Sequence, residues 1–436
     1  MISPQTSPPH FRRNVAALLI DAAGYGFGIS LIYPTTVLPA LARQLTSSEM
    51  LVGLLMTVWS GVWLLPQMVV GRWLSSKPRK KPYMLACTAM GRPILLGMAL
   101  VLMAAGRFSP AILLAALFVV SAIFRGTDAI GVIGWFDIMS GAVPAARRGR
   151  VVGAIQVVSG LTGLVGGTCV QRALGPQGPS FPHNYALLFG LATVGMAISW
   201  AGLASLAEAS GEPAPTSAAQ RGLLDHARHI LTHDRSFRLL TVARTLSGLA
   251  GLALPFYVLH ATRVLNLPSS TIGFFVATQA LIGGASGIGL GWVSERLGTA
   301  RVIQISSVAA CVPPALALIL HVFPWPPALL TAGYLLVYAF LSIVDYSFLL
   351  GYFNYVLEIA PPGQRPAYIG LTNTLGGILI VLPTLGGWLL RNTSYPFLFG
   401  ATVLAVLSGL LAAWRLPPSR TQPVPQANLA SLPPLE

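Results

Sequence analysis

Apolar runs of about 20 residues recur along almost the whole chain, and each is long enough to cross ~30 Å of hydrocarbon as a helix. Only 9% of the residues are charged and 54% are hydrophobic, whereas a soluble domain carries roughly 25% charged residues. This pattern excludes an ordinary soluble globule and predicts an all-α integral membrane protein. The 45 glycines and 34 prolines fit that class, because membrane helices tolerate both residues.

Twelve spans are predicted, six on each side of a polar central stretch. The first six cover roughly 14–42, 50–74, 83–105, 110–140, 151–173 and 185–207, and the second six 238–262, 270–293, 302–323, 328–359, 367–390 and 397–414. The predicted organisation is an N-terminal six-helix half (1–207), a cytoplasmic central loop with an amphipathic segment (208–237), a C-terminal six-helix half (238–414) and a disordered cytoplasmic tail (415–436).

The basic residues report orientation, because cytoplasmic loops collect Lys and Arg. Nineteen of them fall in one set of alternating loops and five in the other. We therefore predict a multi-pass protein of the plasma (inner) membrane with both termini in the cytoplasm. The net charge of +15 is thus explained by basic residues in the cytoplasmic loops, and nucleic-acid binding is not expected.

The chain also reads as two copies of one six-span unit. At an offset of 217 residues, the first copy matches the second at these positions: Asp128, Gly134, Phe136, Pro144 and Arg148 against Asp345, Gly351, Phe353, Pro361 and Arg365. Both copies start on the same side, so they are parallel repeats related by a pseudo-two-fold axis along the membrane normal. Transporters built in this way place the substrate site near the midplane, between the halves.

One loop of each copy carries a recognisable motif. The stretch GWVSERLGTAR has a glycine, an acid four residues later and then further glycine and basic positions, namely Gly291, Glu295, Arg296, Gly298 and Arg301. The first copy, GRWLSSKPRKK, begins at Gly71 and keeps the basic cluster, but Ser75 replaces the acid and Pro78 the second glycine.

This motif, over a duplicated chain of twelve spans, resembles the major facilitator superfamily. The resemblance implies that family's fold and assigns the two loops to gating, together with the repeat-related Arg148 and Arg365. It also implies that Glu295 latches onto the start of span five near Val151, where a helix N-terminus favours a carboxylate. The alternative for Glu295 is an ordinary loop residue.

Charged residues inside the apolar runs are the candidate site, because each costs about 3 kcal/mol or more at the bilayer centre. Arg125 and Asp128 are three residues apart on span four and can form a pair, which can be purely structural. The repeat partner Asp345 has Ser342 where Arg125 stands in the first copy. A carboxyl in a low-dielectric cavity without a close cation can exchange protons, so Asp345 is the first candidate for proton coupling.

Asp21 begins a glycine-rich first span and is a second acidic candidate for substrate or protons, or else the partner of an interior cation. Tyr338 and Tyr352 lie seven residues on either side of Asp345, and Trp135 lies seven after Asp128. These aromatic residues are expected to line the substrate pathway, with an aromatic packing seam as the alternative.

The predicted function is a secondary transporter that moves a small solute by alternating access, proton-coupled, with a lean to efflux of hydrophobic or cationic compounds. Alternatives are an uptake symporter for a nutrient or metabolite, and a membrane receptor or scaffold that does not transport. No enzyme activity, cofactor or metal is expected, because no catalytic or nucleotide-binding motif is found. The expected partners are a small-molecule substrate, a coupling proton and the lipid bilayer, and a monomer is expected.

Overall fold

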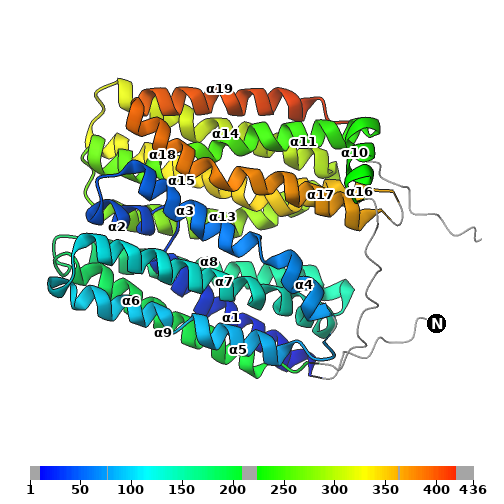
Figure 1. Ribbon diagram of the computed structural model, residues 1–436, viewed down its shortest axis with the longest axis horizontal. Helices are drawn as coiled ribbons and strands as arrows, with labels where there is room; N and C mark the ends of the chain where they lie inside the picture. The colour runs from blue at the N-terminus through cyan, green and yellow to red at the C-terminus, as the bar shows by residue number, and fades with distance from the viewer. Residues whose placement is uncertain (1–9, 76, 209–222, 362–363, 419–436) are drawn as a thin grey trace, which may run out of the picture.

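The computed structural model describes residues 10–75, 77–208, 223–361 and 364–418, and this part of the chain consists of helices and their connections (Figure 1). The elements before the central segment are α1 Phe11–Leu31, α2 Val37–Leu45, α3 Glu49–Leu64, α4 Gln67–Ser75, α5 Lys81–Gly91, α6 Ile94–Met103, η1 Ala105–Arg107, α7 Pro110–Ala142, α8 Ala145–Ala173 and α9 His183–Ser205. Those that follow are α10 Leu223–His233, α11 Arg235–Gly248, η2 Leu249–Leu252, α12 Phe256–Leu259, η3 His260–Val264, α13 Thr271–Leu297, α14 Thr299–Val322, α15 Pro327–Ser347, η4 Phe348–Phe353, α16 Asn354–Ile359, α17 Arg365–Gly377, η5 Ile378–Val381, α18 Leu382–Asn392 and α19 Tyr395–Trp414.

Eleven of the described helical segments are long and apolar enough to cross a membrane, and α3 is a shorter apolar helix. Six predicted spans consist of more than one helical element, namely those at 14–42, 50–74, 83–105, 238–262, 328–359 and 367–390. Proline accounts for the breaks in the first two. The span at 14–42 is broken at Pro34 between α1 and α2, and the span at 50–74 is broken near Pro66 between α3 and α4. The physical reason is that proline lacks a backbone N–H and its ring clashes with the carbonyl four residues earlier.

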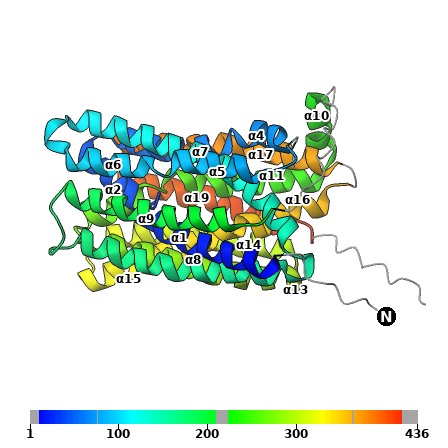
Figure 2. The same cartoon turned by 90° about the horizontal axis from the view of Figure 1, so that it is seen from below.

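The helices form two groups that lie side by side. Figure 1 shows α1 and α4 to α9 in the lower half of the view and α11 and α14 to α19 in the upper half, with α2, α3 and α13 between them, and the long helices of both groups run in nearly the same direction. We call the end where α1 begins and α19 ends the basic end, because Lys80, Lys81, Arg147 and Arg148 lie there, and the other end the opposite end. Figure 2 shows the same alignment from below, with α10 projecting at the basic end.

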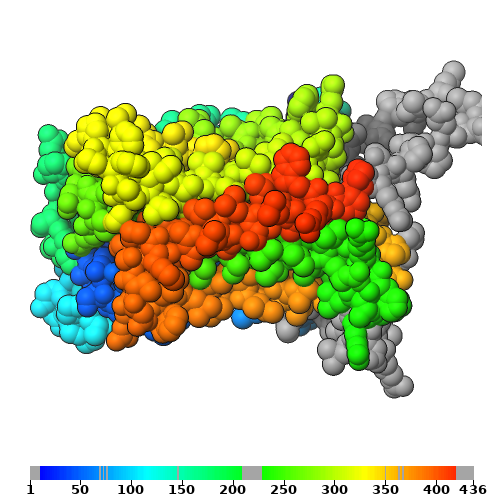
Figure 3. All heavy atoms as spheres, turned by 90° about the horizontal axis from the view of Figure 1, so that it is seen from above, coloured from blue at the N-terminus to red at the C-terminus, as the bar shows by residue number. Residues whose placement is uncertain are grey.

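The outer surface of the bundle is apolar. Figure 3 shows α19 in red on the outer face of the second group. Its large exposed side chains are Phe397, Leu404, Leu407, Leu411 and Trp414. A broad apolar exterior on a helical bundle is the surface that a lipid bilayer covers, and soluble monomers rarely expose one.

The two groups touch through glycines. Gly153, Gly160 and Gly167 are seven residues apart and so lie on nearly one face of α8. A Cβ at Gly167 would lie 2.8 Å from the Cβ of Ala277 on α13, and a Cβ at Gly160 would lie 3.0 Å from the carbonyl oxygen of Ala280. A Cβ at Gly153 would meet no atom within 4 Å. α8 and α13 therefore pack closely toward the opposite end and diverge toward the basic end.

The remaining contacts between the groups agree with this divergence. Among the described residues, the helix pairs that pack across are α3 with α18 and η5, α2 with α12, and α1 and α8 with α13. Thr35 and Gln279 are both buried and hydrogen-bond to each other (Gln279 Nε2 to Thr35 Oγ1, 3.1 Å). The bundle is thus closed at the opposite end and open at the basic end.

The central segment is anchored at both of its described ends. Glu208 accepts hydrogen bonds from the backbone N–H groups of Lys80 (2.6 Å) and Lys81 (3.1 Å), which cap the start of α5. The amphipathic segment does form a helix, α10, but it packs onto the second group through the buried Ile230. Most of the predicted tail, residues 419–436, lies outside the described part of the chain.

Candidate functional site

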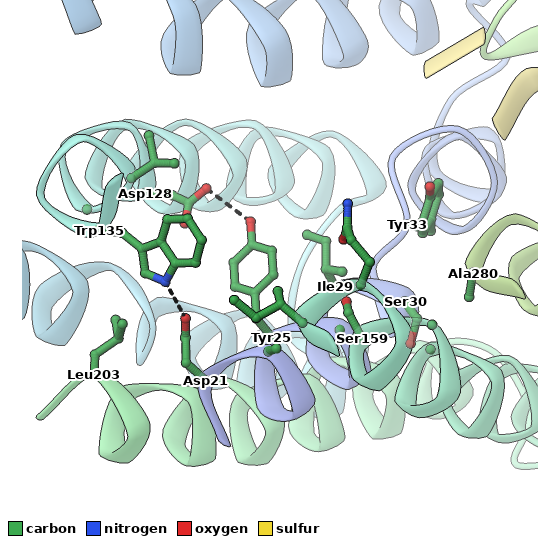
Figure 4. Close-up of a pocket in the computed structure, with 18 of the residues that line it drawn as sticks. Asp21, Tyr25, Ile29, Ser30, Tyr33, Asp128, Trp135, Ser159, Leu203 and Ala280 are labelled. Atoms are coloured by element: carbon green, nitrogen blue, oxygen red, sulfur yellow. Dashed lines mark hydrogen bonds between the residues drawn. The ribbon is translucent and has the colours of Figure 1, made fainter. Parts of the chain in front are cut away.

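A cavity of about 430 Å³ lies between the two groups of helices. Most of its walls come from α1, α7 and α8 of the first group, while the second group contributes Gln279, Ala280 and Tyr346. Of the predicted residues, Asp21, Arg125, Asp128 and Trp135 all line it. Figure 4 shows Asp21, Tyr25 and Trp135 facing this space.

Asp21 is buried, and its carboxylate forms hydrogen bonds and an ion pair. Its carboxylate accepts hydrogen bonds from the hydroxyl of Ser199 and from the indole N–H of Trp135 (2.9 Å, Figure 4). Arg92, also buried, lies 3.9 Å away and donates to the carbonyl oxygen of Met196 (3.0 Å). The interior cation that partners Asp21 is therefore Arg92, and the ring of Trp135 reaches the cavity because Asp21 holds its N–H.

Asp128 is held by two donors. Arg125 pairs with it at 2.8 Å along α7, and the hydroxyl of Tyr25 on α1 donates to the same oxygen at 3.1 Å (Figure 4). The guanidinium of Arg125 also stacks over the rings of Trp59 (4.9 Å) and Trp63 (5.1 Å). The Asp128 carboxylate is thus satisfied without a ligand.

Asp345 has a different environment from its repeat partner. Its side chain is exposed, and it forms no hydrogen bond or ion pair with any residue in the part of the chain that the structure describes. It lies within electrostatic range of Tyr33, which follows α1 in the connection to α2 and lines the cavity. Tyr346, the next residue, lines the cavity from the second group. Asp345 is therefore an acid without a partner at the boundary of the two groups.

Tyr338 and Tyr352 lie outside the cavity. Tyr338 is fully buried and stacks on Phe275 (4.7 Å, 22°). Tyr352 is buried in a separate apolar cluster that includes Ile303 and Tyr355. The seven-residue spacing fails for Tyr352 because the helix widens to π geometry over Phe348–Phe353, so that later residues turn away from the face of Asp345.

Comparisons with known proteins identify the architecture. No family model matches the sequence, and neither does any curated protein sequence. A bacterial homologue of the human lysosomal transporter Spinster, in an inward-facing and unoccupied conformation, is 13% identical over 94% of this chain and 95% of its own, with a TM-score of 0.57. The nucleoside transporter NupG is 14% identical over 92% of this chain and 99% of its own, with a TM-score of 0.67. The xylose transporter XylE from E. coli, in a partially occluded inward-open conformation, is 14% identical over 94% and 98%, with a TM-score of 0.64.

The chain has the major facilitator superfamily (MFS) fold. The two groups of helices are the two halves of that fold, and the central cavity lies between them. The likeness is one of structure at low identity, so the chemistry of the site rests on the residues of this chain.

The second of the two loop motifs has a clear structural basis at Gly298. This residue ends α13 and precedes α14 with φ 84°, a left-handed conformation that glycine adopts without strain. Glu295 is exposed and forms no hydrogen bond or ion pair with a described residue, while Val151 is buried inside the first half. The latch between them is not formed here, because the halves are apart at the basic end, and it stays a prediction for the closed state.

The other predicted gating residues lie around the same end. Arg148 donates to the carbonyl oxygen of Ser140 (2.9 Å), Arg301 to the side chain of Gln304 (3.0 Å), and Arg296 stacks over the ring of Trp292 (5.6 Å). A Cβ at Gly71 or Gly291 would meet nothing within 4 Å, and Arg365 at the start of α17 is exposed. None of these residues bridges the halves in this conformation within the described part of the chain.

Several cavity residues were not predicted from the sequence. Tyr25 lies one turn after Asp21, and Trp63 lies one turn after the buried Trp59, so helical spacing was a usable signal for Tyr25 and Trp63. Gln279 and Tyr346 reach the cavity only because α13 and α15 face the first half, and no local pattern carries that information.

Proposed function

We propose that this protein is a secondary active transporter that moves a small amphipathic organic solute by alternating access and couples its movement to protons through Asp345. The observation that carries the proposal is a central cavity that is closed at one end, with an unpartnered carboxyl at the boundary of the halves. The MFS fold and the transporter neighbours support it. Following the distribution of basic residues, we place the basic end in the cytoplasm of a plasma (inner) membrane protein that works as a monomer.

The cavity chemistry favours an aromatic or cationic solute. Tyr25, Tyr33, Trp63, Trp135 and Tyr346 line it, and aromatic faces attract cations and planar rings. The charged groups at or near the cavity are Asp21, Arg92, Arg125, Asp128 and Asp345. The four lining residues form opposed pairs, so Asp345 leaves one negative charge without a partner. These features support a cationic compound as the solute, and efflux is the direction that we propose for it.

The test is transport of ethidium, a planar and permanently charged cation, by the purified full chain in liposomes with an imposed pH gradient. We expect ethidium to accumulate in the more acidic compartment, which indicates exchange for protons. Accumulation in the alkaline compartment would indicate symport, and ethidium-dependent stabilisation without flux would indicate a receptor.

Asp345→Asn is expected to lower gradient-driven ethidium transport at least tenfold, because the amide cannot bind and release a proton. Asp137→Asn is the matched control, since Asp137 is exposed at the basic end and pairs with Lys80 (2.7 Å) away from the cavity. Full coupling in Asp345→Asn would remove this residue from the mechanism, and Asp128→Asn and Asp21→Asn would then be compared in the same assay.

A further inference from the structure

A chain of titratable side chains crosses the core of the second half near the opposite end. His260 begins η3 and is fully buried. Its Nδ1 hydrogen-bonds to the hydroxyl of Tyr334 on α15, and its Nε2 to Nδ1 of His321 on α14 (2.9 Å). Three separate helices therefore meet in one continuous hydrogen-bonded line that lies apart from the central cavity.

The surroundings of His260 are aromatic. The rings of Tyr395 and Phe399 on α19 each lie 5.0 Å from its ring. Among the described residues, the titratable groups that face it are His321, Tyr334 and Tyr395, with no carboxylate or basic side chain in contact. The ion pair of Arg43 with Glu49 (3.2 Å) interacts electrostatically with Tyr395 and does not interact with His260.

Both ring nitrogens of His260 form hydrogen bonds, and this arrangement allows the ring to pass a proton from one neighbour to the other. A neutral imidazole has one N–H donor and one bare acceptor nitrogen, so one neighbour must donate to it and the other must accept from it. When one nitrogen gains a proton and the other releases one, one N–H bond forms and one breaks while the ring stays in place. A phenyl ring would fill the same space, so packing alone does not account for the two hydrogen bonds.

One end of the line reaches the opposite end of the bundle. His321 is the penultimate residue of α14 and is partly exposed, and the residues that follow it, Phe323 to Pro326, are exposed. Protons from the solution at that end can therefore reach His321 without opening the core.

The other end points along α15 toward Asp345. Tyr334, Tyr338 and Ser342 are buried at successive four-residue intervals, and Asp345 follows three residues later. This face of α15 covers 11 residues, or about 16 Å of helix. The hydroxyls of Tyr338 and of the neighbouring Tyr257 are buried and have no hydrogen-bond partner among the described residues. Buried hydroxyls are normally satisfied, often by ordered water, so these two mark a place for water inside the half.

We propose that His321, His260 and Tyr334 form a proton-entry route that connects the extracellular solution with Asp345 along α15. The inference rests on the proposed function for the identity of the acceptor. The buried hydroxyls of Tyr338 and Tyr257 lie between Tyr334 and Asp345, and water bound to them would continue the route.

The test uses the reconstituted full chain with two readouts, ethidium transport driven by a pH gradient and ethidium exchange at equal pH. Exchange does not require the protein to load or release a proton, so it reports the cavity alone. We expect His260→Asn and His321→Asn to slow gradient-driven transport at least tenfold and to leave exchange within twofold. His183→Asn is the control, because His183 is an exposed histidine at the same end, at the start of α9. Unchanged gradient-driven transport in His321→Asn overturns the route, and this partly exposed site keeps the test valid if His260→Asn does not fold.

A second measurement separates this inference from the proposed function. If the wild-type protein does not move ethidium, the proposed function fails, and ¹⁵N NMR of histidine-labelled protein still tests the relay. We expect His321→Asn to shift the His260 ring signals, because the two rings share a hydrogen bond. His260 signals that do not respond to His321→Asn would overturn the hydrogen-bonded relay.

Discussion

Gly167→Val is expected to open the end of the bundle that is closed in this structure and to slow transport at least tenfold. Gly167 on α8 faces Ala277 and Gly273 of α13, and a Cβ there would lie 2.8 Å from the backbone nitrogen of Ala277 and from the carbonyl oxygen of Gly273. Backbone atoms cannot move aside as a flexible side chain does. Overpacking costs about 1–3 kcal/mol, and each 1.4 kcal/mol changes a conformational equilibrium about tenfold. Contacts with backbone atoms place Gly167→Val in the upper half of that range, so the ratio of closed to open molecules should fall by tenfold or more.

The matched control lies on the same helix face. Gly153→Val makes the same change two heptads earlier, where a Cβ meets no atom within 4 Å, and it should leave this conformation populated. Spin labels at Gln44 and Ser269, both exposed at the opposite end, report the distance between the halves after Cys87, Cys169 and Cys311 have been replaced. A wild-type distance distribution in Gly167→Val would show that the α8–α13 contact does not hold this end closed.

Arg125→Met is expected to lower the free energy of unfolding by about 3–5 kcal/mol, the usual cost of leaving one member of a buried ion pair without its partner. Arg125 and Asp128 are 13% and 15% exposed and lie 2.8 Å apart. After the substitution, Tyr25 remains as the donor to Asp128. The double variant Arg125→Met/Asp128→Asn should recover most of the loss, because it no longer buries a lone charge.

Lys80→Met provides the comparison for that experiment. Its partner Asp137 lies 2.7 Å away but is 47% exposed, and exposed pairs contribute about 0–1 kcal/mol. Unfolding in detergent by denaturant, followed by helical circular dichroism, measures all three variants. Equal losses in Arg125→Met and Lys80→Met would mean that water reaches Asp128 as freely as Asp137.

The architecture was accessible from the sequence because the bilayer imposes it on local patterns. Apolar length places the spans, since backbone groups in hydrocarbon must be satisfied within a helix. The breaks at Pro34 and Pro66 were visible as prolines, yet the choice between a kink and two helices depends on neighbouring helices. The π-helical turn at Phe348–Phe353 had no signal of its own, and the predicted position of Tyr352 failed there.

The site was accessible only in part. The cavity is lined by four of the predicted residues, Asp21, Arg125, Asp128 and Trp135. Charged residues in apolar spans avoid the lipid and face the interior of the bundle, which is why the sequence could indicate them. Asp345 differs from Asp128 in having no ion-pair partner in the described part of the chain. The sequence indicates this difference, because Ser342 precedes Asp345 by three residues where Arg125 precedes Asp128. His260 and His321 are 61 residues apart and meet only through packing, so no spacing rule could have joined them.

The uneven lining of the cavity has a consequence for how such a chain can diversify. The first half supplies nearly all of the cavity wall, while the unpartnered acid and the histidine line belong to the second half. If the proposed function holds, each half can change its role without disturbing the other. Substitutions that alter which solute is accepted are then expected on α1, α7 and α8, and those that alter the driving ion on η3, α14 and α15.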